Sequence, residues 1–531
     1  MKKVLLSCLT LAFTASLATA QVRYLEEVFP TTESESDVEF GRNWSFLLGA
    51  TPDSPLNTDV YKPVGDAATD RAAVIVLHTG NFLPKYLNQS PSGNNGDSAI
   101  VVTSEMFAKR GYVAFAPNYR LGWLPTQSNP DGRRGSLLNA VYRSLNDVKT
   151  LVRYIKKSVA EDGNPYGVDP DKIIVYGHGS GGYLSLAYGS LDRIEELENE
   201  ASGKWISTSD VLDAQTADTL FYANELYINE GLVGGIDGFG GMLNDSNHYG
   251  YTNDVVACVN VGGALGDSAW MEAGEPPLIS FHCPDDGFAP FTTGTVIVPT
   301  TGETVVDVVG SRWAIGQANA LGNNDPLYNG KTFNDPYTQA AEAALAANHQ
   351  HLNLNADDYK GLFPFRRDPI AFPFQESSPW QWWDDQTEHP IASIFLTSQG
   401  ATDMLQSANA GSPTMSAAQG KAYLDSIHGF LAPRLRELLM QDVSIEESEF
   451  VDANTFVYPN PANDYLVVKT RQGIRIKDVE IYNMSGALVR TESGLNKLSH
   501  QINGIDQFTP GLYLVKVRTD QGLITRKALV E

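Results

Sequence analysis

The residues best suited to chemistry lie in a glycine-rich turn, Gly-His-Gly-Ser-Gly-Gly at 177–182. A β-branched run at 173–175 precedes this turn, and apolar residues at helical spacing follow it. The pattern predicts a strand, a sharp turn and a helix. Such a turn can present a nucleophile above a sheet, with small residues two positions before and after it because strand and helix approach closely. The stretch therefore predicts a site built for nucleophilic catalysis.

Two registers of this turn are open. If Gly177 and Gly181 are the small flanking residues, the nucleophile position falls on Gly179, which has no side chain to attack a substrate. If Ser180 is the nucleophile, the bulky His178 stands two positions before it. The end of the predicted strand at 176–177 favours the first register. The same stretch thus predicts a turn of the kind that carries a nucleophile, but in the favoured register it has no side chain that could perform hydrolysis.

Several further segments resemble the carboxylesterase and lipase branch of the α/β-hydrolases. They are Leu-His-Thr-Gly at 77–80, Phe-Ala-Lys-Arg-Gly-Tyr-Val at 107–113, Asn-Tyr-Arg-Leu-Gly at 118–122 and Tyr-Gly-Val-Asp-Pro at 166–170. The resemblance extends over about residues 40 to 440. It implies an α/β-hydrolase fold, with a doubly wound and mostly parallel sheet, and a serine esterase site with oxyanion donors.

The resemblance implies roles for particular residues. The oxyanion donors match Gly80, Asn81 and the backbone N–H of Ser180, beside Gly179, and these groups could also hold a carboxylate or carbonyl in a protein that cleaves nothing. The stretch 277–290 resembles the family's strand and acid loop, so Asp286 matches the acid. Its strand-end histidine, His282, is structural in the family.

The catalytic base has no clear candidate. The family places it in a loop after the next strand, which is predicted at 304–309, and the residues that follow, 310–314, contain no histidine. His428, in Ile-His-Gly-Phe at 427–430, is one later candidate, and His349 and His351 are others. An active esterase would therefore use Ser180, Asp286 and His428.

The elements that must position these residues alternate along the chain. Apolar runs predict strands at 72–77, 112–117, 254–261 and 276–282, and a stripe of apolar residues predicts a helix at 137–159. Residues 21–443 are thus predicted to form one α/β domain, entered through short strands at 44–48 and 60–63. Insertions are expected at 191–250 and at 310–412, the second irregular. A closing helical segment at 415–440 is expected to break or kink between Gly429 and Pro433. Arg120 and Asp147 could pair as a buried brace below the turn.

The C-terminal part has a different character. An acidic linker at 444–455 leads to 456–531, where short apolar runs at 465–469, 479–482, 487–490 and 513–517 predict a small β-sandwich. This part resembles the C-terminal sorting domain of proteins exported by the type IX secretion system of Bacteroidota. The resemblance rests on Tyr-Pro-Asn-Pro at 458–461, Val-Glu-Ile-Tyr-Asn at 479–483 and Pro-Gly-Leu-Tyr-Leu-Val at 510–515. It implies the type IX secretion machinery as a partner.

Composition agrees with export. The chain has 531 residues and a formal net charge of −25, which disfavours nucleic acid and anionic membranes as partners. Residues 1–20 have the pattern of a signal peptide, and no later stretch is apolar enough to span a bilayer. We therefore expect a protein secreted to the medium or the outer cell surface. Cys258 and Cys283 are expected as buried free thiols rather than a disulfide, and no residue spacing indicates a metal or cofactor.

Three functions stay open from the sequence. The first is a hydrolase-fold protein without a working triad, a pseudoenzyme that binds a ligand or partner. The second is an active carboxylic-ester hydrolase that uses Ser180. The third is a structural or adhesive protein of the cell surface, which the aromatic stretch at 378–383 would suit. A hydrogen bond between Ser180 and a histidine would separate the second from the first.

Overall fold

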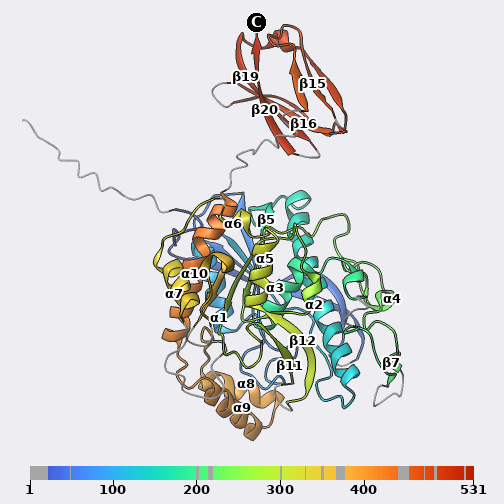
Figure 1. The fold of residues 1–531 in the computed structure, drawn as a ribbon, viewed down its shortest axis with the longest axis vertical. Coiled ribbons are helices and arrows are strands. Elements are labelled where there is room, and N and C mark those ends of the chain that lie inside the picture. The colour runs from blue at the N-terminus through green and yellow to red at the C-terminus, as the bar shows by residue number, and fades with distance from the viewer. Residues whose placement is uncertain are drawn as a thin grey trace, which may run out of the picture. The chain divides into compact units, whose positions relative to one another are not determined.

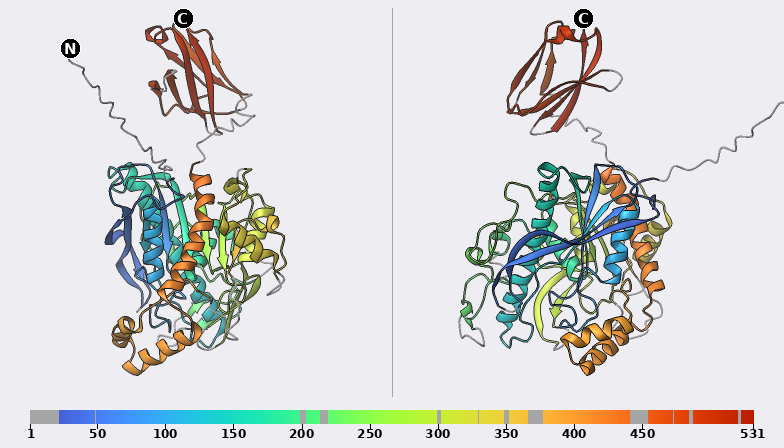
Figure 2. Two further views of the ribbon diagram at one scale, coloured as in Figure 1. Left: turned by 90° about the vertical axis from the view of Figure 1, so that its left-hand side faces the viewer. Right: turned by 180° about the vertical axis from the view of Figure 1, so that it is seen from behind.

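The computed structural model divides the chain into two compact units, Met1–Leu439 and Met440–Glu531, which are described separately (Figures 1 and 2). The structure describes residues 22–47, 49–198, 203–212, 219–298, 302–328, 330–347, 352–365, 377–440, 454–471, 473–483, 487–519 and 522–531. The predicted signal peptide at 1–20 lies outside them, as do His349, His351 and most of the predicted acidic linker. Among the described residues, no helix has the length and apolar character needed to cross a membrane.

An eight-stranded sheet runs through the first unit in the order β1-β2-β4-β3-β5-β8-β10-β13. β1, β2 and β4 are antiparallel neighbours, and the strands from β4 to β13 are parallel. The strands are β1 (Thr32–Ser45), β2 (Thr51–Pro63), β3 (Arg71–Leu77), β4 (Val113–Pro117), β5 (Val168–His178), β8 (Ala257–Val261), β10 (Leu278–His282) and β13 (Leu362–Pro364). This topology confirms the predicted α/β-hydrolase fold.

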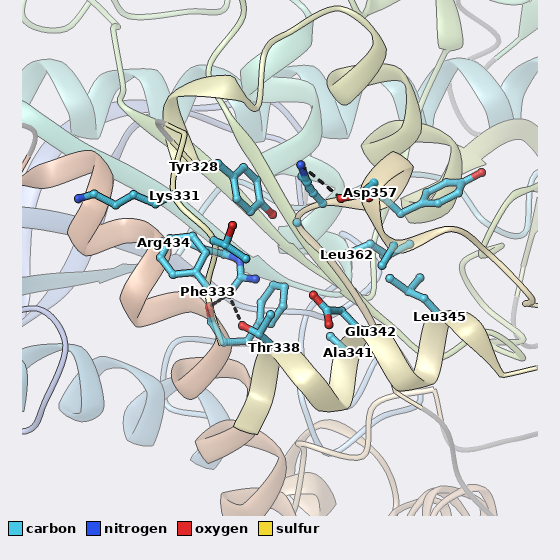
Figure 3. Close-up of a pocket in the computed structure, with 16 residues that line it drawn as sticks. Tyr328, Lys331, Phe333, Thr338, Ala341, Glu342, Leu345, Asp357, Leu362 and Arg434 are labelled. Carbon is cyan, nitrogen blue, oxygen red and sulfur yellow. Dashed lines mark hydrogen bonds and ion pairs between the residues drawn. The ribbon is translucent and has the colours of Figure 1, made fainter. Parts of the chain in front are cut away.

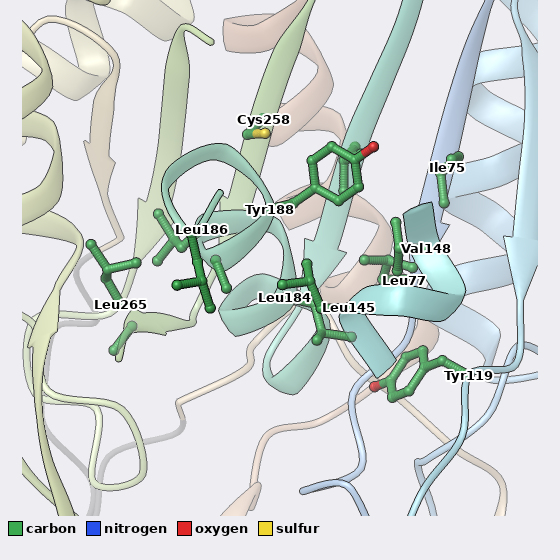
Figure 4. Packing of buried hydrophobic residues seen from close by; sticks show 14 of the residues in the cluster. Ile75, Leu77, Tyr119, Leu145, Val148, Leu184, Leu186, Tyr188, Cys258 and Leu265 are labelled. Carbon is green, nitrogen blue, oxygen red and sulfur yellow. The ribbon is translucent and has the colours of Figure 1, made fainter. Parts of the chain in front are cut away.

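Helices cover both faces of the sheet because its central strands are apolar on both sides. In β3 the alternate residues Ala73, Ile75 and Leu77 pack on one face. Their neighbours Ala72, Val74 and Val76 pack on the other. The first face carries α2 (Pro130–Ala160), α3 (Ser180–Ser190) and α5 (Ser311–Ala320), and Figure 4 shows side chains of this core. The second face carries α1 (Ser98–Lys109), α7 (Pro336–Ala346) and α10 (Ala417–Leu439).

The segment 310–412, expected to be irregular, is largely helical, so that prediction is wrong. Besides α5 and α7 it contains α6 (Asp325–Tyr328), α8 (Asp385–Phe395) and α9 (Ser398–Gly411). It also supplies the edge strand β13, which has three residues and is too short for a periodic pattern. The predicted strand at 304–309 exists as β12 (Thr304–Gly310), but it joins β9 (Ala264–Leu265) and β11 (Thr293–Ile297) in a separate sheet. The 191–250 segment holds β6 (Val211–Leu212), β7 (Thr219–Phe221) and α4 (Glu230–Val233).

Two boundary predictions also need correction. The entry region forms two long antiparallel strands, β1 and β2, rather than two short ones. α10 is one helix with Pro433 inside it, so the predicted break does not occur, while the alternative, a kink between Gly429 and Pro433, stays a prediction. Its apolar side chains pack against the sheet face and α1, and this burial keeps the helix continuous where the proline removes one backbone donor.

The second unit is all β, as predicted. One sheet has the order β14-β15-β18 and the other β17-β16-β19-β20, and their inner side chains form one apolar core. The strands are β14 (Thr455–Tyr458), β15 (Tyr465–Thr470), β16 (Ile476–Asn483), β17 (Leu488–Glu492), β18 (Ser499–Asn503), β19 (Gly511–Thr519) and β20 (Gly522–Val530). Three of these strands, β14, β18 and β20, were not predicted from the sequence.

Candidate active site

The glycine-rich turn joins β5 to α3 at a single residue, Gly179. Its φ of 53° and ψ of −114° are a backbone conformation that side-chain-bearing residues rarely adopt. On either side, a Cβ on Gly177 would overlap the carbonyl of Gly181, and one on Gly181 would lie 2.7 Å from the His78 carbonyl oxygen. Strand, turn and helix therefore pack too closely for larger residues, as the predicted sharp turn requires.

Thr79 lies directly against Gly179. A Cβ on residue 179 would overlap Thr79 Oγ1 and stand 3.0 Å from Thr79 Cβ. Thr79 follows β3 in the loop that faces the turn, and it is half-buried. The space that a side chain on residue 179 would need is therefore occupied by a threonine hydroxyl from another loop.

Ser180 is the first residue of α3 and is buried, with 4% of its surface exposed. Its Oγ lies 3.2 Å from the hydroxyl of Tyr119, and that hydroxyl donates to the carbonyl of His78 at 2.7 Å. Because the tyrosine has one proton and gives it to His78, Ser180 donates its own proton to the tyrosine oxygen. Burial raises the pKa of Tyr119, so this acceptor stays a neutral phenol. Ser180 is thus bonded to a tyrosine and not to a basic histidine.

Asp286 lies after β10 with a side chain that is 3% exposed. Its Oδ1 accepts hydrogen bonds from the backbone N–H groups of Phe288 (2.7 Å) and Ala289 (3.0 Å). Burial raises the pKa of Asp286 to about 7, against the opposing effect of these bonds and of a hydrogen bond with Ser377. The carboxyl is therefore held in a dry environment where its charge is poorly solvated.

His282 is near Asp286 but is occupied elsewhere. Its Nε2 is 3.0 Å from the carbonyl oxygen of Ala289, and its Nδ1 is 2.7 Å from Ser311 Oγ. The carbonyl can only accept, so Nε2 carries the proton and Nδ1 accepts from the serine. Burial lowers the pKa of His282 to about 4. The ring is neutral and fully bonded, and its 3.7 Å distance from Asp286 is not an ion pair.

His428 lies within α10, away from α3. Its ring packs edge-on against Phe107 of α1, with ring centroids 4.5 Å apart, in the core between the sheet and these two helices. It is 1% exposed, and its Nε2 has no hydrogen-bond partner among the described residues. Burial lowers its pKa well below the usual value, and the nearby Arg110 and His178 lower it further. No contact among the described residues joins Ser180, Asp286 and His428.

The loop after β3 contains Gly80 and Asn81, which are predicted as oxyanion donors. Gly80, Asn81 and Phe82 all have positive φ, at 133°, 56° and 55°. The loop is held from behind, because Asn81 O accepts from Trp123 Nε1 at 2.8 Å and Gly80 O accepts from Asn88 Nδ2 at 3.3 Å. Within the described ranges, the N–H groups of Gly80, Asn81 and Ser180 have no acceptor. Their role as donors to a ligand oxygen stays a prediction.

The loop in which the catalytic base was predicted follows β12, but the strand that lies beside β10 in the main sheet is β13. The chain leaves β13 at Phe365, and residues 366–376 lie outside the described ranges. In the sequence, the stretch from 365 to the start of α8 at Asp385 contains no histidine. The next histidine, His389 in α8, has its Nε2 3.0 Å from Thr402 Oγ1. The chain returns at Ser377, and the buried Trp380 then lies 5.9 Å from the His178 ring, centroid to centroid. Sequence reasoning missed the contacts of Thr79, Tyr119 and Ser377 because they depend on tertiary packing.

Two predicted supporting features are confirmed. Arg120 Nε lies 2.8 Å from Asp147 Oδ1, and both side chains are almost fully buried. Arg120 also donates its backbone N–H to Asp147, which ties the loop after β4 to α2. Cys258 and Cys283, on neighbouring parallel strands or their ends, are both buried and are not joined in a disulfide.

Comparison with known proteins gives two family matches. Residues 58–217 match the family described as BD-FAE, and residues 456–531 match the secretion system C-terminal sorting domain. The chain thus carries an esterase-like α/β-hydrolase domain and a type IX sorting domain. The second indicates type IX secretion to the cell surface or the extracellular space and interaction with that machinery. Among curated proteins, none matches the chain significantly.

Solved structures similar to this chain include esterase 2 of Thermogutta terrifontis. Its propionate-bound form has 20% sequence identity and a TM-score of 0.27, and the match covers 51% of this chain and 78% of that one. The form phosphorylated by paraoxon has 20% identity and a TM-score of 0.28, with 51% and 77% covered. At these values the likeness carries no argument about activity.

Proposed function

We propose that this protein is an exported member of the hydrolase-fold proteins whose turn at 177–182 binds a carbonyl- or carboxylate-bearing ligand without cleaving it. The observation that carries the proposal is Gly179, at the residue that joins β5 to α3 with φ 53°. In the hydrolase turn this residue is the nucleophile, and glycine has no attacking atom. The fold is kept and the acyl-transfer step is lost.

The surroundings of Gly179 support the proposal. Thr79 Oγ1 takes the space of the missing side chain, and no histidine contacts Ser180 among the described residues. The proposed oxyanion donors, the N–H groups of Gly80, Asn81 and the first residue of α3, have no acceptor among the described residues, which supports the proposal. Backbone donors at a strained loop and a helix start suit a negatively charged or polarised oxygen. Recognition of such an oxygen needs no nucleophile.

The esterase function with Ser180, Asp286 and His428 is the alternative that the experiment must exclude. It would require a base within about 3.2 Å of Ser180 Oγ. Ser180 bonds to Tyr119 instead, and His428 packs against Phe107. The adhesive alternative rested on the aromatic stretch at 378–383, whose Trp380 is fully buried. Neither alternative is favoured by a specific contact.

The test uses the full chain, a fluorophosphonate probe and short-chain p-nitrophenyl esters. Ser180→Ala is compared with Ser185→Ala, a matched control in the same helix whose buried Oγ donates to the Val175 carbonyl. We expect no labelling and no turnover that depends on Ser180. Labelling and turnover that vanish in Ser180→Ala and persist in Ser185→Ala would establish an esterase and overturn the proposal.

Binding is measured separately with butyrate by calorimetry. We propose the hydroxyl of Thr79, beside Gly179, as a further donor to the ligand oxygen, and Thr79→Val removes it while keeping the shape of the side chain. We expect it to weaken butyrate binding by roughly 5- to 10-fold, the usual value of one hydrogen bond. Unchanged affinity, or no saturable binding in the unaltered chain, would contradict binding at this turn.

A further inference from the structure

A cavity lies at the opposite end of the sheet from the glycine-rich turn. It has a volume of about 110 Å³ and lies between α7, α10 and the first residues of β13 (Figure 3). β13 and β5 are parallel strands of one sheet, so the first residues of β13 and the last residues of β5 lie at opposite ends of the strands. The cavity is therefore separate from the site proposed above.

A buried arginine lines this cavity. Arg434 is 3% exposed, and its guanidinium carbon stands 3.5 Å from the centre of the Phe430 ring and 4.8 Å from that of Phe333. Its Nη1 donates to Thr338 Oγ1 at 3.1 Å and to the Phe430 carbonyl at 2.7 Å. Its Nε is buried without an acceptor among the described residues. A planar cation is thus sandwiched between aromatic rings with donor capacity left over.

The charge of Arg434 is not balanced by a carboxylate. No acidic side chain of the described residues lies within ion-pair distance of it. Glu437, one helical turn after Arg434 in α10, pairs with Lys331, and Asp357, which lines the cavity, pairs with Lys360. Glu342 also lines the cavity but is solvent-exposed at its rim. A buried charge without a partner is costly, so this arginine is suited to a partner that comes from outside.

The rest of the lining defines the shape and polarity of that partner. Part of the lining is apolar or aromatic, from Phe333, Ala341, Leu345, Leu362 and Phe430, and the remainder is polar, including Thr338, Lys331 and Lys360. The phenol of Tyr328 lies beside the guanidinium, with its ring centre 5.7 Å from the Arg434 carbon. A guanidinium pairs best with a planar, two-oxygen anion, and aromatic walls favour a flat apolar body behind it.

We propose that this cavity is a binding site for a small monocarboxylate with a compact aromatic or branched apolar body. Arg434 holds the carboxylate, and Phe333 and Phe430 contact the body. The site carries no nucleophile and performs binding only. A multiply charged phosphate is disfavoured, because Arg434 is the only buried cation among the described residues of the lining, and the carboxylates of Glu342 and Asp357 also line the cavity.

The test titrates the full chain with benzoate by calorimetry, beside benzamide and inorganic phosphate. Benzamide has the size of benzoate without its charge. Arg434→Gln removes the cation, and Ala341→Leu fills the cavity while Arg434 stays. Lys331→Gln, at an exposed lysine on the rim, is the matched control. Circular dichroism checks the fold of each variant.

We expect benzoate to bind the unaltered chain saturably. Benzamide should bind the unaltered chain roughly 10- to 100-fold more weakly, and the Arg434→Gln variant should bind benzoate more weakly by the same factor, as for one lost charge-assisted pair. Ala341→Leu should weaken benzoate to the same degree, Lys331→Gln by no more than about threefold, and Thr79→Val not at all. Equal binding of benzoate and benzamide would overturn the proposal, as would phosphate binding more tightly than benzoate. If Arg434→Gln does not fold, undiminished binding by Ala341→Leu overturns it alone.

Discussion

Thr79 and Gly179 exclude a side chain from the tip of the turn between β5 and α3. The hydroxyl of Thr79 stands where a Cβ on residue 179 would be, although the two residues are a hundred positions apart. The two identities are therefore coupled: a glycine at 179 permits a threonine at 79, and a serine at 179 would need a smaller residue there. Residue 179 therefore has no side chain, and the space for one is taken by Thr79.

This coupling predicts how the turn responds to a restored serine. Gly179→Ser should cost about 2–5 kcal/mol in the free energy of unfolding, from positive-φ strain and from overlap with Thr79. Adding Thr79→Gly should recover the overlap part, leaving about 1–2 kcal/mol. Urea unfolding of the full chain measures both. Gly163→Ser is the control, because Gly163 has φ +75° and open space around it. Equal costs for Gly179→Ser and Gly163→Ser would contradict the coupling.

The hydrogen bond between Ser180 and Tyr119 makes a second prediction. Ser180→Ala and Tyr119→Phe should each destabilise the chain by about 1–2 kcal/mol, the tyrosine more, because it also donates to the His78 carbonyl. The two changes together should cost less than their sum, with a coupling of about 0.5–1.5 kcal/mol. A double-mutant cycle in urea measures the coupling. Strict additivity would mean that the bond does not contribute, and that the Ser180 proton is free for other partners.

The sequence predicted the sheet more completely than the site. Long apolar strands such as β3 and β5 are recognisable from their sequence pattern. The glycines at 177–182 indicate, from the sequence alone, that a strand and a helix approach each other closely. β13 was not predicted because a strand of three residues shows no periodic pattern. The predicted position of the catalytic base was therefore counted from β12. His428 was located on a helix, but the face it presents depends on how α10 packs. The overlap of Thr79 with residue 179 is a tertiary contact that no local pattern encodes.

The buried carboxyl of Asp286 predicts a specific pH dependence. Folding raises its pKa to about 7, so between about pH 4 and pH 7 the folded chain holds a proton that the unfolded chain has released. The stabilisation is present in full below the unfolded pKa and is lost as the pH rises through the folded one. The loss is about 1.4 kcal/mol for each pH unit crossed between the two pKa values.

Asp286→Asn isolates this effect, because an amide cannot ionise and keeps the acceptor for Phe288 and Ala289. Between pH 5 and pH 8, we expect the unaltered chain to lose stability relative to this variant, by an amount on the order of 1–3 kcal/mol. Chemical unfolding at the two pH values gives the difference. Asp285→Asn, at the exposed neighbour, should change in free energy of unfolding between the two pH values by the same amount as the unaltered chain. The same result for Asp286→Asn would mean that the Asp286 carboxyl ionises normally.

The ion pair of Arg120 and Asp147 predicts a large and asymmetric cost. Arg120→Met leaves the carboxylate of Asp147 buried without its partner, so we expect a loss of about 3–5 kcal/mol in the free energy of unfolding. The double variant Arg120→Met/Asp147→Leu removes both charges and should lose less than Arg120→Met alone. Lys172→Gln, whose ion pair with Asp169 is partly exposed, should cost no more than about 1 kcal/mol. Urea unfolding compares the three. A double variant less stable than Arg120→Met would show that the pair stabilises the loop after β4 beyond neutralising its own charges.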